Sequence, residues 1–172
     1  MIKSTMKFNR LRIENAQTMV EFALVFPLIL LITYGIIEIG RVMFIYAEVT
    51  GAAREGARYG VASGLVPGVS PDTPYYAYCD GIMQAARRIT ILIPTGDINI
   101  SVKYLTGSSS SVKQTCPFTY SKASDPIIQG DRIRVEVNVY YSPIVGEFLG
   151  FSGFNIKALN FRTILKTVEI TN

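Results

Sequence analysis

One long apolar run constrains this chain more than any other feature. From Met19 to Ile37 the only charged side chain is Glu21, and leucine, isoleucine, valine and phenylalanine dominate. The run has about 19 residues, which in a helix span about 28 Å, close to the hydrocarbon thickness of a bilayer. Pro27 is tolerated in lipid as a local bend. We therefore predict one membrane-spanning helix over about residues 19–37, in preference to the buried core helix of a soluble domain.

Basic residues precede this run and set its expected orientation. Residues 1–16 contain four basic side chains and a single acidic one, Glu14. The positive-inside rule then places the N-terminus in the cytoplasm and the rest of the chain outside. Most of the net charge of +4 belongs to this leader, so no nucleic-acid-binding patch is expected. A cleavable secretory signal fits poorly, because no small-x-small site follows the apolar run.

The helical pattern continues beyond the membrane run to Ser63 and becomes rich in small residues. Glycine weakens a helix by about 1 kcal/mol relative to alanine, so repeated glycines indicate a packing requirement. The spacing of Gly56 and Gly60 allows another element to approach the backbone closely. We expect Gly51, Gly56 and Gly60 to pack either against the chain's own outer domain or against a neighbouring subunit.

Residues 64–172 are predicted to form an α+β domain outside the membrane. A linker rich in proline and glycine, residues 64–78, precedes a second helix that Asp80 is expected to cap and that Pro94 is expected to end. Alternating apolar and polar residues predict strands over residues 97–105, 130–143 and 156–170, with a serine-rich loop over residues 106–113. The expected fold is a second helix on a small antiparallel sheet.

The two cysteines, Cys79 and Cys116, both lie on the outer side of the membrane in this topology. In an oxidising compartment such a pair favours a disulfide over free thiols. The bridge would close a loop of about 38 residues and stabilise the domain by about 3 to 4 kcal/mol.

Catalysis is not expected, and no metal or cofactor site is predicted. The chain contains no histidine, which removes the commonest general base and most zinc sites. The outer aspartates stand singly beside turn residues. A calcium site in the loop over residues 125–131 is a minor alternative. An apolar set near residues 144–154 is expected to be a covered loop or, alternatively, a contact surface for a partner subunit; its members are Ile144, Val145, Phe148, Leu149, Phe151 and Phe154.

The blocks AQTMVEFALVFPLILL, GIIEIGRVMF and AAREGARYG together resemble the N-terminal signature of the TadE-like family, pseudopilins of the tight-adherence branch of type IV pilus systems. The resemblance covers about residues 16–60 strongly and the remainder only by pattern. It implies a pilin-like head and processing by a prepilin peptidase between Ala16 and Gln17. Type IV prepilins usually have glycine before the cut, so Ala16 is a departure.

The resemblance also implies a role for Glu21, which becomes the fifth residue of the processed chain. A carboxylate at this depth either stays among the lipid headgroups or needs a positive partner. In an assembled pilus that partner is the new amino group of Gln17 on a neighbouring subunit, so Glu21 would set the assembly register.

The predicted organisation is a basic cytoplasmic leader (1–16), a long helix (17–63) and an outer head (64–172). The leading functional hypothesis is a minor, non-enzymatic pilin or pseudopilin of a Tad-type pilus, used for adhesion or secretion. It is held in the inner membrane with the N-terminus inside, and then enters the periplasm or the surface pilus. Its expected partners are the peptidase, other subunits, the assembly machinery and membrane lipid. The alternative is a static single-pass protein whose outer domain binds a ligand or partner, and a membrane-tethered enzyme ranks third.

Overall fold

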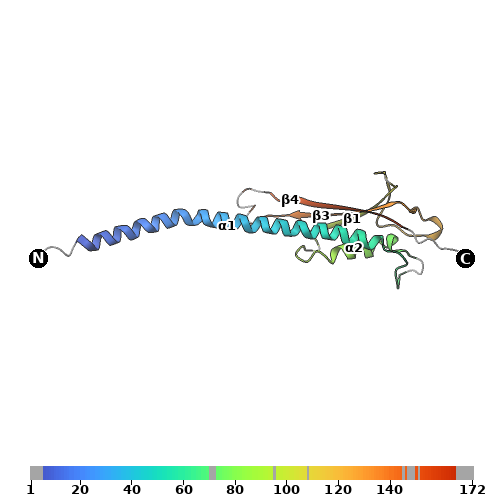
Figure 1. Cartoon of the computed structure of the whole chain (residues 1–172), viewed down its shortest axis with the longest axis horizontal. Helices are drawn as coiled ribbons and strands as arrows, with labels where there is room; N and C mark the ends of the chain where they lie inside the picture. The colour runs from blue at the N-terminus through green and yellow to red at the C-terminus, as the bar shows by residue number, and fades with distance from the viewer. Residues whose placement is uncertain are drawn as a thin grey trace. The chain divides into compact units, whose positions relative to one another are not determined.

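The computed structural model describes residues 6–69, 73–94, 96–107, 109–144, 146, 150 and 152–165. It has the predicted α+β fold, with a long apolar helix, a second helix and a small antiparallel sheet (Figure 1). The chain divides into two compact units, one up to Arg41 and the other from Val42 onward. A single helix, α1 (Met6–Gly60), contributes to both units.

In the first unit, α1 carries the apolar run with its side chains exposed. The helix continues through Pro27. It is long and apolar enough to cross a membrane, and no residue of its most apolar window is buried inside the protein. The hydroxyl of Tyr34, near the end of this run, donates a hydrogen bond of 3.1 Å to Glu38, which also lies 3.6 Å from the Arg41 guanidinium. Polar partners therefore satisfy the first charged residue after the run.

The second unit contains the remainder of α1 and all other elements. These are η1 (Tyr75–Ala77), α2 (Cys79–Arg87), β1 (Ile98–Leu105), β2 (Val112–Thr115), η2 (Lys122–Ser124), β3 (Arg132–Tyr141) and β4 (Phe154–Thr163). The four strands form one antiparallel sheet in the order β2-β1-β3-β4. The long pairings run from Ile98↔Val139 to Leu105↔Arg132 and from Arg132↔Thr163 to Tyr141↔Phe154.

The strict alternation of β3 explains why the sheet has one apolar face. Its inward residues are all buried, and α1 packs on them. They are Ile133, Val135, Val137, Val139 and Tyr141. The outer face is polar. There the Lys157 ammonium group forms an ion pair of 2.5 Å with the Glu136 carboxylate, and the Arg132 guanidinium lies 5.1 Å from the centre of the Phe161 ring. The core therefore lies between the sheet and the helices.

In the second unit α1 lies between β3 and α2 (Figure 1). Gly60 adjoins Ile82 near the start of α2, and Gly51 adjoins Ile89 just beyond its end. The two helices are therefore antiparallel, and the end of α2 lies toward the Val42 end of the unit.

The second helix is shorter than predicted. It was expected to run from an Asp80 cap to Pro94, but α2 ends at Arg87, and Asp80 lies in its first turn. The Thr90 hydroxyl bonds back to the Arg87 carbonyl, and the next backbone amides bond to a carboxylate of α1. The β-branched residues after Arg88 also favour helix only weakly. A tertiary contact thus ends α2 early.

Other boundaries also differ from the sequence pattern. Helix α1 ends at Gly60, three residues before the expected Ser63. The serine-rich loop gives way at Val112 to a short edge strand, β2, which was not predicted because its side chains are mostly half-exposed. Strand β4 begins at Phe154 and ends at Thr163. The last residues of the predicted strand, 166–170, lie outside the described residues.

The predicted disulfide is present. Cys79 and Cys116 are bonded, with Cα atoms 5.8 Å apart, and they join the first residue of α2 to the residue after β2. The Tyr104 hydroxyl lies 3.5 Å from the Cys116 sulfur and donates a hydrogen bond to the Tyr76 carbonyl. The bridge therefore adjoins a buried aromatic cluster at one edge of the sheet.

We expect the double variant Cys79→Ala/Cys116→Ala to lower the free energy of unfolding of the head by about 3 to 4 kcal/mol, because the open loop gains conformational freedom in the unfolded state. Urea unfolding of the full chain in detergent micelles measures this change. Adding a reductant to the wild type should reproduce the loss and leave the double variant unaffected. Equal stability of the two proteins would contradict the prediction.

Candidate functional site

Glu21 and Gln17 lie one helical turn apart on α1, and both are exposed. Among the described residues, no basic side chain forms an ion pair with Glu21. Ala16 lies in the same helix, directly before Gln17. The structure thus presents the predicted cleavage and register positions on one continuous helix. Glu21 can accept a positive partner, which none of the described side chains supplies.

Two of the three predicted packing glycines are buried in the head. A Cβ atom on Gly56 would lie 3.2 Å from both Ala86 and Val135, and one on Gly60 would lie 2.5 Å from Ile133. Gly51 is half-buried, and its Cβ would lie 3.1 Å from Ile89. Gly56 and Gly60 thus adjoin the chain's own α2 and β3, and Gly51 adjoins Ile89 just after α2, as in the first of the two alternatives.

Glu48 is a buried, hydrogen-bonded side chain that the sequence analysis did not identify. It is buried, and its Oε1 atom accepts hydrogen bonds of 3.2 Å from the backbone amides of both Ile91 and Leu92. A buried carboxylate is costly unless hydrogen bonds satisfy it. The helical period could have revealed it, because Glu48 shares the buried face of α1 with Ile45 and Ala52.

An aromatic cluster lies around the disulfide. The Tyr76 hydroxyl donates a 2.6 Å hydrogen bond to Asp125, and the Tyr104 ring packs edge-on against Phe118. Burial raises the pKa of both the Tyr76 and the Tyr104 hydroxyl, and the neighbouring Asp125 carboxylate adds to this rise. These tyrosines therefore stay protonated and act as structural donors.

Asp131 links β2 to the turns that follow β1 and precede β3. Its buried carboxylate lies 2.7 Å from the Lys113 ammonium group on β2, and it accepts hydrogen bonds from the amides of Ile128 and Gly107. Burial by itself raises the pKa of this carboxyl, but the hydrogen bonds from Lys113, Ile128 and Gly107 outweigh burial and lower the pKa. The ionised form therefore stabilises the junction of β1, β2 and β3.

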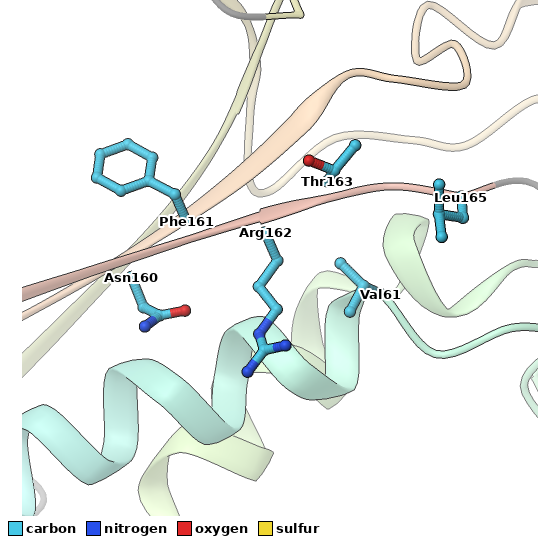
Figure 2. A pocket seen from close by; sticks show the side chains of 6 residues that line it. All are labelled: Val61, Asn160, Phe161, Arg162, Thr163 and Leu165. Atoms are coloured by element: carbon cyan, nitrogen blue, oxygen red, sulfur yellow. The ribbon is translucent and has the colours of Figure 1, made fainter.

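An open groove of about 460 Å³ lies between the end of α1 and β4 (Figure 2). Figure 2 shows Asn160 and Arg162 directed from β4 toward α1, with Val61 and Leu165 nearby. The buried Oδ1 atom of Asn160 accepts no hydrogen bond from the described residues. The exposed Arg162 forms no ion pair among them. The groove offers a cation and a free acceptor but no acid–base pair.

The described part of the chain contains no group of three His, Cys, Asp or Glu side chains that could hold a metal. In the loop over residues 125–131, the minor alternative for a calcium site, the carboxylates of Asp125 and Asp131 accept hydrogen bonds from Tyr76, Lys113 and backbone amides.

The apolar set near residues 144–154 is only partly described. Ile144 and Phe154 are 67% and 49% exposed, which favours the contact-surface alternative over the covered loop. Its other members, Val145, Phe148, Leu149 and Phe151, lie outside the described residues.

A family model described as TadE-like protein matches residues 16–58. The match covers about a quarter of the chain and confirms the resemblance over this part of α1. No curated protein and no solved structure matches the chain.

The stability of the head should depend on pH through Asp131. Its pKa lies below the ordinary value of 3.8, so its contribution is present above that value and is lost as the pH falls through the lowered pKa. We expect Asp131→Asn to lower the free energy of unfolding at pH 7 by about 1–3 kcal/mol. The variant should also lose less stability than the wild type on acidification. Urea unfolding between pH 7 and pH 2 measures both effects, with Asp97→Asn, an exposed turn position, as the control.

Close packing at Gly56 gives a second prediction. We expect Gly56→Leu to destabilise the head by about 1–3 kcal/mol, because α2 and β3 leave no space for the side chain. The matched control is Gly40→Leu, since a Cβ there meets no atom within 4 Å. Thermal unfolding of both variants compares them. Equal melting temperatures would show that α1 does not pack as closely as described.

Proposed function

We propose that this chain is a minor pilin-like subunit of a Tad-type pilus, a non-enzymatic pseudopilin that is processed before Gln17 and incorporated through helix packing. The single observation that supports this most is the match of residues 16–58 to the TadE-like family, with Gln17 and Glu21 one turn apart on an exposed helix. The apolar helix is consistent with a single membrane anchor.

Processing would create a positive partner for Glu21, which forms no ion pair among the described side chains. A carboxylate in lipid without a counter-charge is costly, and cleavage before Gln17 frees an ammonium group. When two subunits meet, the Glu21 carboxylate of one and this ammonium of the other neutralise each other in a low-dielectric setting. The pair stabilises only one axial offset between the helices, so it acts as a register for assembly.

The second unit is suited to an extracytoplasmic location. Its two cysteines are bonded to each other, as expected in an oxidising compartment. We infer that the leader stays in the cytoplasm and the head lies outside the inner membrane, because basic residues cluster in residues 1–16. The partners would then be a prepilin peptidase, the inner-membrane assembly machinery and other pilin subunits.

The groove between α1 and β4 favours a second candidate function. An exposed Arg162 beside the unpaired Asn160 carbonyl group can recognise a carboxylate or amide of a ligand. In this reading the chain stays in the membrane as a static single-pass protein, and its head binds a partner. Such a protein needs neither cleavage before Gln17 nor a charge at Glu21.

The N-terminal sequence and intact mass of the protein from native membranes test the proposal. We expect the mature chain to begin at Gln17, and Ala16→Gly to be cut at least as completely. Glu21→Ala should be processed but not incorporated, because breaking a buried pair by removing one partner costs about 3–5 kcal/mol. The fractions of each variant in membranes and in sheared pili measure incorporation.

Glu55→Ala provides a matched control for this experiment. Glu55 is a half-exposed glutamate of α1, 3.6 Å from Arg58, so its removal should leave processing and incorporation unchanged. A functional chain that still begins near Met1 would contradict the peptidase step. The static anchor would then be the better description.

A further inference from the structure

The turn after α2 combines exposed apolar and basic side chains. Ile91 and Leu92 are 83% and 63% exposed, and Arg87 and Arg88, which Ile89 and Thr90 separate from this pair, are also exposed. An apolar pair beside two guanidinium groups is the composition that suits a lipid–water interface, where apolar side chains enter the acyl boundary and cations stay among the headgroups.

A buried carboxylate fixes this turn in place. Glu48 of α1 accepts hydrogen bonds from the backbone amides of Ile91 and Leu92, while their side chains remain outside the core. Ile93, the next residue, is buried in that core. The turn is therefore held on both sides, and the exposure of the two apolar side chains is a built feature of the fold.

The turn lies at the end of the second unit where α1 enters. Along α1, Gly60 adjoins Ile82, Gly51 adjoins Ile89, and Glu48 binds the turn itself, so successive contacts approach Val42. The same end carries Phe154, which is half exposed and pairs with the Tyr141 ring at 5.3 Å. Gly60 adjoins Ile133 and Gly56 adjoins Val135, so β3 runs along α1 toward Val42 and ends with Tyr141 near the start of the unit.

Chain connectivity keeps this end near the membrane whatever angle the two units adopt. The apolar run ends at Ile37, and the second unit begins at Val42. These five steps along the chain span about 7.5 Å as helix and about 18 Å at full extension. The bilayer surface is thus within short reach of the end of the unit that carries the turn.

We propose that the second unit docks on the extracytoplasmic surface of the membrane that anchors the chain. Ile91 and Leu92 would enter this membrane–water interface, with Arg87 and Arg88 at the headgroups of anionic lipid. This inference rests on the membrane span of the proposed function. Docking would hold the head down on the bilayer before assembly, and a subunit leaving the membrane would have to release it.

Tryptophan fluorescence tests the proposal, because the chain contains no tryptophan of its own. Leu92→Trp is placed in the full chain and reconstituted into vesicles of phosphatidylcholine and phosphatidylglycerol with brominated acyl chains. The emission should shift to shorter wavelength. Bromine should quench it at least about twofold more strongly than in Ile128→Trp, since an interfacial side chain reaches the acyl boundary. Ile128 is 57% exposed and adjoins Asp131 at the opposite end of the head.

Phe26→Trp, in the apolar run, separates the two ways in which the experiment can fail. If this probe escapes quenching, the membrane span is wrong and the proposed function fails with it. If Phe26→Trp is quenched but Leu92→Trp behaves like Ile128→Trp, only the docking proposal is overturned. A shift in Leu92→Trp that occurs without quenching and disappears on dilution with lipid would assign the face to a second copy of the chain, and would also overturn docking.

Discussion

The structure depends on the close approach of α1 to both β3 and α2. A Cβ atom on Gly56 would lie 3.2 Å from both Ala86 of α2 and Val135 of β3. This approach lets one helix serve two environments: its first part is apolar on all sides, and its second part is buried against the head. Because the sheet of the head needs a helical cover for Val135 and Val137, the head has no complete core without α1. The helix that carries the apolar run is therefore also required for the head to fold.

Local patterns predicted the elements whose stability comes from a single buried face. Strand β3 alternates strictly through Val135, Val137 and Val139, and this pattern predicted the strand over residues 130–143, two residues too long at each end. The disulfide followed from two cysteines on one side of a membrane. The end of α2 could not be predicted in this way, because Glu48, more than 40 residues earlier in the sequence, binds the amides after it. Strand β2 was missed since an edge strand buries too little to impose a period.

The predicted site residues also differ in how far the sequence alone could explain them. The sequence reading identified Gly56 and Gly60 as packing positions but could not choose between two partners, because a glycine records only that something is close. The structure supplies the partner as α2 and β3. The groove at Asn160 and Arg162 had no sequence signal, since it exists only where the end of α1 meets an edge strand. Glu21 is the reverse case, because its interest comes wholly from its place in the sequence and the family match.

The way α1 lies in the head has a mechanical consequence. Its contacts run in a line along the helix axis from Ile45 through Val49 and Ala53 to Gly60. A pull applied at Val42 along that axis loads all of these contacts at once, in shear, instead of opening them one after another from an edge. Shear of many small contacts in parallel needs a larger force than peeling, because no single contact can fail ahead of the rest. The packing that gives the head its core thus also lets α1 transmit a pulling force to the head without separating from it.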